Sequence, residues 1–560
     1  MLNDPSLSEL IAAARRPTSR DAAPADGETV GSLLARRSVA HPGRDWLVYV
    51  DESGSRTVLS YGEAGARVAA LAALLAGLGV GRGDRVATLA HNHPDTVLQY
   101  LAAWSLGACV VPLNAGEDAA RLAFILADAR VKLLFTRAEY LDRVAPLRAE
   151  LPDLRDVVLA GDRRRGYAHA DDAALVPDAG PSTPETDDEA LLVYTSGTTG
   201  RPKGVVLTHG NLLVDARQIA DWHALGPDDR MMCVLPIHHV NGIVVTLVTP
   251  LACGGTVVLC RKFRTESFFP LLARECVQVV SVVPTLLAFL LQGADKGAVA
   301  AGRPDLPGFR HLICGAGPLT CELALRFEAR FGLRIVHGYG LSETTCYACF
   351  LPVDLPPDEH RAWLGDHGFP SIGTPIPANE MAIHDAAGGA LPAGERGEIV
   401  IRGATVMAGY FGADEANRQA FAHGWFRSGD EGFWLPARDG RPYFFITGRL
   451  KELIIRGGVN VSPLEVDEVL MSVPGVQAGI AVGFAHDVYG EEVGAYVVPL
   501  PGAELDAGAV LDFCRGALPR HKCPKVVVFG DEAPVTATGK YQRNRLKPLF
   551  AAWRGADFRD

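Results

Sequence analysis

A stretch rich in glycine and hydroxyl side chains at residues 194–204 reads Tyr-Thr-Ser-Gly-Thr-Thr-Gly-Arg-Pro-Lys-Gly. It directly follows the apolar residues 191–193, which are expected to form a buried strand. Glycines let backbone amides approach an anion, serine and threonine hydroxyls add hydrogen-bond donors, and the lysine adds a positive charge. The stretch therefore predicts a loop that binds a polyphosphate. It lacks the spacing of a Walker A loop, so a different kind of phosphate site is indicated.

Strands and helices alternate on both sides of this loop. Residues 85–89 and 109–113 are expected to be strands, and residues 96–106 between them a helix. A strand, a helix and a strand within about 30 residues predict a parallel pair of strands. Ser60 and Glu63 have the spacing of a capping box and predict the start of another helix. The fold class indicated is α/β.

The length of the chain and a change of pattern near its C-terminal end indicate more than one domain. A chain of 560 residues is too long for one hydrophobic core. Residues 1–28 lack periodicity and are expected to be a flexible lead. Residues 29–448 are expected to form a large N-terminal α/β domain with several subdomains, and residues 449–560 a small C-terminal α+β domain.

Local predictions concern three segments. Residues 243–259 are apolar but are broken by Pro250, so they are read as buried strands and a turn, because a membrane-spanning helix needs roughly 20 uninterrupted apolar residues. Residues 451–455 read as a strand that continues through residues 459–461. Residues 462–465, Ser-Pro-Leu-Glu, have the pattern of a capped helix start.

Composition excludes some classes of function. The chain has 54 basic and 65 acidic residues and a formal net charge of −11, which disfavours a nucleic-acid-binding surface. The eleven cysteines are scattered, and no basic and then apolar run follows Met1. Reduced thiols and a cytoplasmic location without a membrane span are therefore expected.

The loop at residues 194–204 resembles the phosphate loop of the adenylate-forming superfamily, which comprises acyl-CoA synthetases, stand-alone adenylation enzymes and firefly-type luciferases. Further segments resemble those of the family in the same order, from about residue 30 to residue 548. The resemblance implies a large AMP-binding and acyl-binding domain followed by a mobile C-terminal domain.

Residues 339–344, Tyr-Gly-Leu-Ser-Glu-Thr, resemble the nucleotide-site segment of the family. The resemblance implies that Tyr339 lies against the adenine and that the Thr344 hydroxyl meets the α-phosphate. It also implies that Glu343 and Thr195 hold Mg²⁺. This agrees with the preference of nucleotide-bound Mg²⁺ for one or two carboxylates beside phosphate oxygens.

Three later segments complete the implied nucleotide site. Asp430, in Trp-Phe-Arg-Ser-Gly-Asp, matches the aspartate that accepts hydrogen bonds from both ribose hydroxyls. Arg449 would contact the nucleotide, and Lys451 would lie at the pivot between the domains. Lys540, in Pro-Val-Thr-Ala-Thr-Gly-Lys, matches the catalytic lysine that stabilises charge in the transition state.

Residues 236–242 resemble the junction of the acyl pocket and the pantetheine tunnel, and His239 matches the gate residue of acyl-CoA synthetases. Amino-acid-activating modules place an aspartate here, and its absence disfavours an α-amino acid. Small residues near Gly338 leave room for a medium-chain or aromatic acid. The stretch at residues 346–372, long for the family, is expected to form a lid or an altered pocket wall that could close this room.

The candidate residues fall into overlapping sets. The catalytic set is Lys540, Arg449, Thr195, Glu343 and His239. The nucleotide-binding set is Thr195, Ser196, Gly197, Thr198, Thr199, Gly200, Lys203, Gly315, Ala316, His337, Gly338, Tyr339, Gly340, Thr344, Asp430, Arg449 and Lys540. The substrate-binding set is His239, Val240, Asn241, Val283, Gly315, Gly338, Leu341 and Thr345.

The resemblance implies a two-step reaction. A carboxylic acid is activated by ATP and Mg²⁺ to an acyl-adenylate, and CoA then takes the acyl group as a thioester. Two alternatives stay open for the second step: transfer to the phosphopantetheine arm of a separate carrier protein, and attack by another nucleophile. A homodimer is also left open.

Overall fold

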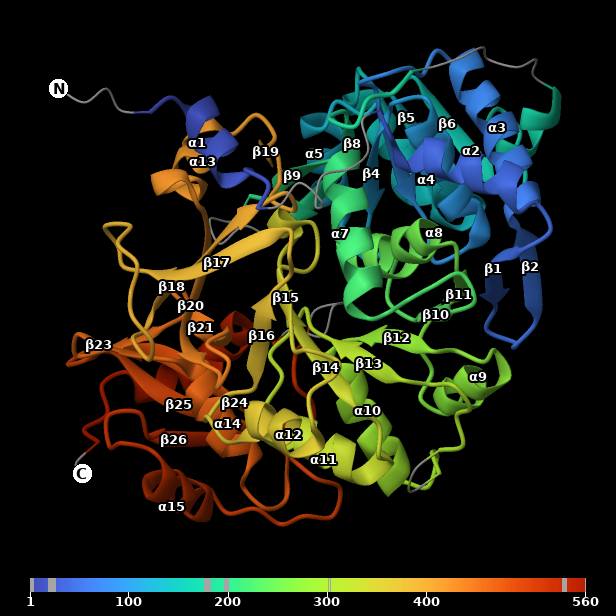
Figure 1. The fold of residues 1–560 in the computed structure, drawn as a ribbon. Helices are drawn as coiled ribbons and strands as arrows, with labels where there is room; N and C mark the ends of the chain where they lie inside the picture. Colours follow the sequence, from blue (N-terminus) through green and yellow to red (C-terminus); the bar gives the residue numbers. More distant parts are fainter. Residues whose placement is uncertain are drawn as a thin grey trace.

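The computed structural model describes residues 5–18, 27–175, 183–195, 201–300, 302, 304–535 and 541–558. Within these residues the largest sheet has 13 strands in the order β17-β18-β20-β21-β16-β15-β14-β13-β12-β10-β11-β1-β2 and runs across the whole molecule (Figure 1). The strands are β1 (Asp45–Val50), β2 (Arg56–Ser60), β10 (Arg230–Cys233), β11 (Thr256–Cys260), β12 (Val279–Val282), β13 (His311–Cys314), β14 (Ile335–Tyr339), β15 (Cys349–Phe350), β16 (Ser371–Pro375), β17 (Asn379–His384), β18 (Gly397–Gly403), β20 (Phe426–Pro436) and β21 (Pro442–Arg449). The neighbouring pairs from β1–β11 through β13–β14 in this order are parallel. The pairs β14–β15 and β15–β16 that follow are antiparallel.

A second sheet holds the strand that leads into the glycine-rich loop. Its order in the described part of the chain is β19-β9-β8-β4-β3-β5-β6-β7. The strands are β3 (Arg85–Leu89), β4 (Cys109–Leu113), β5 (Leu133–Arg137), β6 (Asp156–Ala160), β7 (Ala168–His169), β8 (Glu189–Thr195), β9 (Lys203–Thr208) and β19 (Gly409–Tyr410). Strands β3 and β4 pair in parallel on either side of α4 (Pro94–Ser105), which confirms the strand–helix–strand prediction.

Helices fill the space between the two sheets and cover their outer faces. Helix α7 (His209–Trp222) is buried over most of its length and lies between the sheets (Figure 1). Helix α3 (Tyr61–Gly77) begins at the predicted capping box, in which Ser60 Oγ accepts a hydrogen bond from the Glu63 backbone N–H. The others near the sheets are α2 (Val30–Ala40), α5 (Ala119–Asp128), α9 (Phe268–Arg274), α10 (Pro284–Asp295), α11 (Cys321–Phe331), α12 (Pro357–Gly365) and α13 (Asp414–Ala420).

The C-terminal part forms a small α+β domain with its own hydrophobic core. Its sheet has the order β23-β22-β25-β24, and β26 pairs with β25. The elements are β22 (Ile454–Arg456), β23 (Val459–Val461), β24 (Val476–His486), β25 (Gly490–Pro499), β26 (Val526–Phe529), α14 (Pro463–Met471), α15 (Ala507–Ala517) and α16 (Arg543–Leu546). Ser462 caps α14 as predicted. The α/β fold with a small C-terminal domain is confirmed, and the mobility of that domain remains a prediction.

The prediction for residues 243–259 is wrong in its first half. The segment contains a π-helix, η5 (Asn241–Val248), followed by α8 (Thr249–Cys253), and only then the strand β11. All residues of η5 are buried, against α7, β10 and β12 among others. A short apolar run buried on all sides has no periodicity that separates helix from strand. No helix in the described part of the chain combines the length and the apolar composition needed to cross a membrane.

Two further predictions need correction. Lys451 lies in a turn, and β22 and β23 form an antiparallel hairpin rather than one strand, because Gly457 and Gly458 between them adopt φ angles of +56° and +83°. The expected flexible lead contains α1 (Leu7–Ala14), which packs against α13 and its neighbouring turn and buries Ala14. Residues 1–4 and 19–26 lie outside the described residues.

Candidate active site

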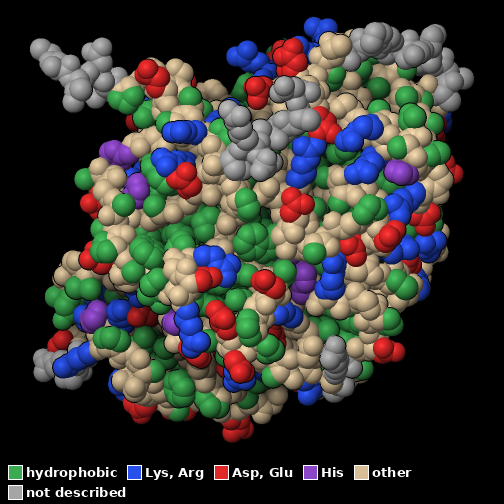
Figure 2. All heavy atoms as spheres, viewed as in Figure 1, with side chains coloured by type: hydrophobic (Ala, Val, Ile, Leu, Met, Phe, Trp, Pro, Cys, Tyr) green, Lys and Arg blue, Asp and Glu red, His purple; other side chains and the backbone are tan. Residues whose placement is uncertain are grey.

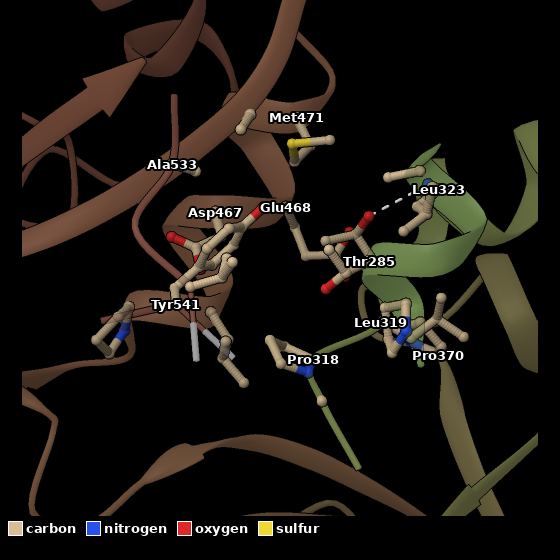
Figure 3. Close-up of a pocket in the computed structure, with 18 of the residues that line it drawn as sticks. Thr285, Pro318, Leu319, Leu323, Pro370, Asp467, Glu468, Met471, Ala533 and Tyr541 are labelled. Carbon is tan, nitrogen blue, oxygen red and sulfur yellow. Dashed lines mark hydrogen bonds between the residues drawn. The ribbon is translucent and has the colours of Figure 1, made fainter. Parts of the chain in front are cut away.

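The carboxyl ends of β13 and β14 open into a cleft of about 580 Å³ between the two domains. Figure 3 shows Asp467, Glu468 and Tyr541 of the small domain facing Thr285, Leu319 and Leu323 of the large domain across this cleft. Figure 2 shows hydrophobic side chains gathered near the centre of one face of the molecule, with charged side chains around them. We call this space the interdomain cleft. Several expected nucleotide residues line it: Ala316, His337, Gly338, Tyr339, Gly340, Asp430 and Arg449.

A buried carboxylate lies at one side of the interdomain cleft. Asp430 and Arg449 are partners across β20 and β21, and Arg449 Nε lies 2.9 Å from Asp430 Oδ1. The Tyr339 hydroxyl donates a hydrogen bond of 2.7 Å to Asp430 Oδ2. Burial and the neighbouring Asp430 raise the pKa of Tyr339, so the phenol keeps its proton and acts as the donor. Three residues from three separate strands thus form one group, joined by a hydrogen bond and an ion pair.

The expected phosphate side of the site lies at the hairpin of β8 and β9. Thr195 and Lys203 are register partners at the end of the hairpin that borders the loop. Lys203 Nζ lies 4.8 Å from the ring centroid of Tyr410, and the Tyr410 hydroxyl donates a hydrogen bond of 2.9 Å to Glu343 Oε1. The hairpin is therefore linked through one tyrosine to the carboxylate expected to hold Mg²⁺.

Tyr410 was not among the residues singled out from the sequence. Its position between Gly409 and Gly412 is a weak signal for a functional aromatic residue. Ser196, Gly197, Thr198, Thr199 and Gly200 of the expected phosphate loop lie outside the described residues, and so does Lys540.

A strained turn follows the nucleotide-site segment. Thr345 has φ +65° and ψ −61°, and the Cys346 N–H donates to the Thr344 carbonyl at 2.8 Å, so Thr345 is the centre of a γ-turn. Such a conformation is unfavourable for a β-branched residue. It is held in place by a hydrogen bond of 2.6 Å from Thr345 Oγ1 to the Thr405 carbonyl. The Thr344 hydroxyl meanwhile accepts from the Leu341 N–H at 2.9 Å.

Two adjacent histidines, His238 and His239, precede η5. His238 lines a second cleft of about 480 Å³, and the ring of His239, the expected gate, lies 4.3 Å from that of His238. Burial lowers the pKa of His238, so it is neutral at physiological pH. His337, expected near the nucleotide, is buried, and its Nδ1 lies 2.9 Å from the Ser371 carbonyl oxygen. Burial lowers the pKa of His337 to about 4, and this residue braces β14 against β16.

The room expected beside Gly338 is occupied. A side-chain carbon added at Gly338 would lie 2.4 Å from the Phe350 ring and 2.9 Å from the Tyr347 ring, and one at Gly315 would lie 2.7 Å from the Tyr347 hydroxyl. Asn241 Nδ2 donates to the Tyr347 hydroxyl at 3.3 Å, and Ser281 Oγ donates to Asn241 Oδ1 at 2.8 Å. The first residues of the stretch 346–372 therefore pack against Gly315 and Gly338. The stretch also contains α12, in which Trp363 stacks on Tyr443 at 4.0 Å.

The second cleft lies beside the interdomain cleft. Its lining includes Arg261 and Lys262, and Thr285, Phe289 and Val535 line both clefts. Val535 belongs to the segment that leads to residue 540. We call this second space the basic cleft, after its two cationic side chains.

The comparisons with known proteins agree with this geometry. Residues 34–411 match the AMP-binding enzyme family, and residues 465–540 match the AMP-binding enzyme C-terminal domain. A sulfoacetate–CoA ligase of Cupriavidus necator is 37% identical over 93% of this chain and 97% of its own length. A feruloyl-CoA synthase of an Amycolatopsis species is 36% identical over 88% of this chain and 94% of its own. The crystal structure of ATP-bound MatB from Rhodopseudomonas palustris superposes with a TM-score of 0.81, at 29% identity, over 93% of this chain and 99% of its own.

The chain therefore belongs to the AMP-binding enzyme family. Within that family it is an acyl-CoA ligase that forms AMP.

Proposed function

We propose that this ligase binds ATP in the interdomain cleft, activates a carboxylic acid there and passes the acyl group to CoA in the basic cleft. The observation that carries the proposal is the group formed by Asp430, Tyr339 and Arg449. Asp430 is only 1% exposed; its Oδ2 accepts the hydrogen bond from Tyr339, and its Oδ1 lies in the ion pair with Arg449. A carboxylate oriented in this way is suited to accept hydrogen bonds from the two ribose hydroxyls.

In the first step a carboxylate oxygen of the acid attacks the α-phosphorus, and the bond to pyrophosphate breaks. Lys203, Arg449 and Lys540 supply positive charge where negative charge gathers on the phosphate oxygens. Thr344 and the loop of residues 195–203 position the phosphates, so that positioning and electrostatics provide most of the acceleration.

Glu343 fits the role of a magnesium ligand. Its Oε1 is oriented by Tyr410, and the hairpin with Thr195 and Lys203 is joined to it through the same tyrosine. Bound Mg²⁺ would be held by Glu343, Thr195 and the phosphates, and would neutralise charge on the nucleotide. A single protein carboxylate is sufficient, because ATP supplies the other oxygens.

In the second step the thiol of CoA attacks the acyl carbon of the adenylate, and AMP leaves. The basic cleft supports CoA as the acceptor, because Arg261 and Lys262 are suited to its phosphates. Burial and Arg261 lower the pKa of His91 in the same cleft to about 3, so this histidine stays neutral. Rotation of the small domain about Lys451 would change the site from the arrangement for adenylation to the arrangement for thioester formation.

All eleven cysteines are free thiols, which supports a cytoplasmic location.

The test is to incubate the enzyme with ATP, Mg²⁺, CoA and one acid at a time, and to measure AMP and acyl-CoA by mass spectrometry. The proposal expects equal amounts of the two products. An Asp430→Ala variant should lose both, whereas Asp439→Ala, a change of an exposed aspartate in a turn, should lose neither. AMP without acyl-CoA would contradict CoA as the acceptor and would favour a carrier protein or another nucleophile.

A further inference from the structure

We infer that Asn417 is a positioning residue of the adenylation site and that it acts through Tyr410 on Glu343 and Lys203. The inference rests on the proposed function, because that function gives the two charged residues their places beside ATP and Mg²⁺. Asn417 lies in α13, which packs beside β19 (Figure 1), and its side chain is only 6% exposed. It belongs to none of the motifs singled out in the sequence, so its role is read from its contacts.

The side-chain amide of Asn417 holds the backbone of Tyr410 at two points. The Tyr410 N–H donates a hydrogen bond of 2.6 Å to Asn417 Oδ1, and Asn417 Nδ2 donates one of 2.9 Å to the Tyr410 carbonyl oxygen. A primary amide carries the acceptor and the donor that this pairing requires. The close approach depends on Gly409, because a side-chain carbon there would lie 3.2 Å from Asn417 Oδ1. The amide therefore fixes the direction in which the Tyr410 side chain leaves the backbone.

Residues 404–411, which we call the strap, connect this pair of hydrogen bonds to the rest of the large domain. At the other end of the strap, Asn211 Nδ2 of α7 donates to the carbonyl oxygens of Ala404 and Val406, at 2.8 and 3.0 Å. An asparagine amide thus holds the strap near each of its ends. Both asparagines are buried, so water does not compete for these hydrogen bonds.

The strap reaches both charged residues. The Met407 N–H donates to the Glu343 carbonyl oxygen at 2.9 Å, and β19 within the strap pairs with β9, the strand that begins at Lys203. The Tyr410 hydroxyl donates to Glu343 Oε1 at 2.9 Å, while the centroid of its ring lies 4.8 Å from Lys203 Nζ. Burial and the charge of Glu343 raise the pKa of Tyr410, so the hydroxyl keeps the proton that it donates.

Glu343 lies at the side of the interdomain cleft. Its turn, η6 (Ser342–Thr344), begins directly after Leu341, which lines that cleft. Asp430, and more weakly Glu343, raise the pKa of Arg449, another lining residue. The Glu343 carboxylate is therefore close enough to the cleft to interact with a charge there.

Tyr410 also keeps two opposite charges apart. Within the described part of the chain neither Lys203 nor Glu343 forms an ion pair, although both side chains contact the same tyrosine. A lysine paired with this carboxylate would be less available to a phosphate group, and the carboxylate would be less available to Mg²⁺. By setting the position of the ring, Asn417 leaves one charge for the phosphates and the other for the metal.

The experiment has two readouts, the Mg²⁺ concentration for half-maximal pyrophosphate release and the binding of ATP to the free enzyme by isothermal titration calorimetry. Asn417→Ala removes both hydrogen bonds to Tyr410. The inference expects this variant to need about fivefold more Mg²⁺, the effect of about one net hydrogen bond, with kcat at saturating Mg²⁺ unchanged. ATP binding should weaken by a similar factor with Mg²⁺ present, and by less without it, where only Lys203 is affected.

A double-variant cycle tests whether Asn417 acts through Tyr410. Tyr410→Phe removes the hydroxyl that orients Glu343. In that background Asn417→Ala should change the Mg²⁺ requirement by less than about twofold, because the connection is already broken. Gln419→Ala is the matched control: Gln419 is another amide side chain of α13, but it is exposed and hydrogen-bonded to Glu415 of the same helix. This control should match the wild type in both readouts.

The outcomes separate the inference from the proposed function. A wild-type Mg²⁺ requirement in Asn417→Ala, a fall in kcat alone, or additive effects in the double variant would overturn the inference. If Asn417→Ala does not fold, Asn417→Asp keeps the size of the side chain and its acceptor but loses the donor, and the same increase in Mg²⁺ requirement is expected of it. A wild-type enzyme that binds ATP with Mg²⁺ but releases pyrophosphate with no acid would contradict the proposed function, and the calorimetric comparison would still decide the role of Asn417.

Discussion

The backbone N–H of Cys321 in the large domain donates a bifurcated hydrogen bond to Glu468 of the small domain, with distances of 2.9 and 3.1 Å to the two oxygens of its carboxyl group. Cys321 is the first residue of α11, so the carboxyl group lies at the N-terminal end of that helix, where backbone N–H groups lack partners within the helix. Together with the ion pair between Arg396 and Glu465 at 3.6 Å, this contact holds the small domain over the interdomain cleft.

The Glu468 contact predicts that docking of the small domain depends on pH. Burial raises the pKa of Glu468 from 4.5 to about 8. The docked state therefore binds the proton more tightly than an undocked state with an ordinary pKa, and docking weakens as the pH rises between these two values. Small-angle scattering from pH 5 to pH 9 should show the molecule expanding as the pH increases.

A Glu468→Gln variant is the control for this pH dependence. Its amide oxygen still accepts from the Cys321 N–H but does not titrate, so the variant should stay compact across the range. A wild-type molecule that becomes more compact at higher pH would show that attraction of the charged carboxylate to the helix end outweighs its burial.

The group formed by Asp430, Tyr339 and Arg449 predicts losses of activity that differ in size between variants. Asp430→Ala leaves Arg449 without its partner and removes both ribose acceptors, so acid-dependent pyrophosphate release should fall by about 100-fold or more. Tyr339→Phe removes only one hydrogen bond to Asp430 and should cost about tenfold, mainly as a higher KM for ATP. Steady-state kinetics with varied ATP measure both. Equal losses in the two variants would indicate that the tyrosine acts by more than orienting the aspartate.

The magnesium assignment predicts a shift in metal dependence. Glu343→Gln should raise the Mg²⁺ concentration needed for half-maximal pyrophosphate release by about tenfold, because a charged ligand is lost. Tyr410→Phe, which frees the Glu343 carboxylate to reorient, should shift it less. Removal of Mg²⁺ with a chelator should abolish activity in every variant. An unchanged Mg²⁺ dependence in Glu343→Gln would exclude Glu343 as a ligand.

The γ-turn predicts that two substitutions at Thr345 destabilise the large domain to different extents. Thr345→Ala keeps the unfavourable φ and loses the hydrogen bond to Thr405, so the large domain should be destabilised by about 1–2 kcal/mol. Thr345→Gly loses the same bond but tolerates a positive φ, so it should be less destabilising than Ala. Urea denaturation of the two variants compares them. Greater destabilisation by glycine would show that the turn is not strained.

Local patterns predicted the regular parts of the fold well. The limits of β3 and β4 were predicted to the residue, and the caps of α3 and α14 lie where Ser60 and Ser462 indicated. The two strands are short, mostly apolar runs and the two helices are capped, so the information is local in the chain. The η5 helix was mistaken for strand because every residue of it is buried and its composition is β-branched.

The site was predictable only where a motif contains the residue. Tyr339, Asp430 and Arg449 lie in three separate motifs, and the structure brings them into contact; their roles toward ATP stay predictions. Tyr347 and Tyr410 lie outside the motifs, and each gains its place through a partner distant in sequence, Asn241 and Glu343 respectively. Such pairings depend on tertiary packing, which neither spacing nor composition encodes.

The most direct test of the central claim is a single-turnover experiment with enzyme, ATP, Mg²⁺ and an acid that supports pyrophosphate release, in the absence of CoA, followed by addition of CoA. The account predicts pyrophosphate and an enzyme-bound acyl-adenylate in the first phase, then AMP and acyl-CoA when the thiol is added. Release of ADP and phosphate in place of AMP and pyrophosphate, or acyl-CoA formed without a preceding adenylate, would contradict it.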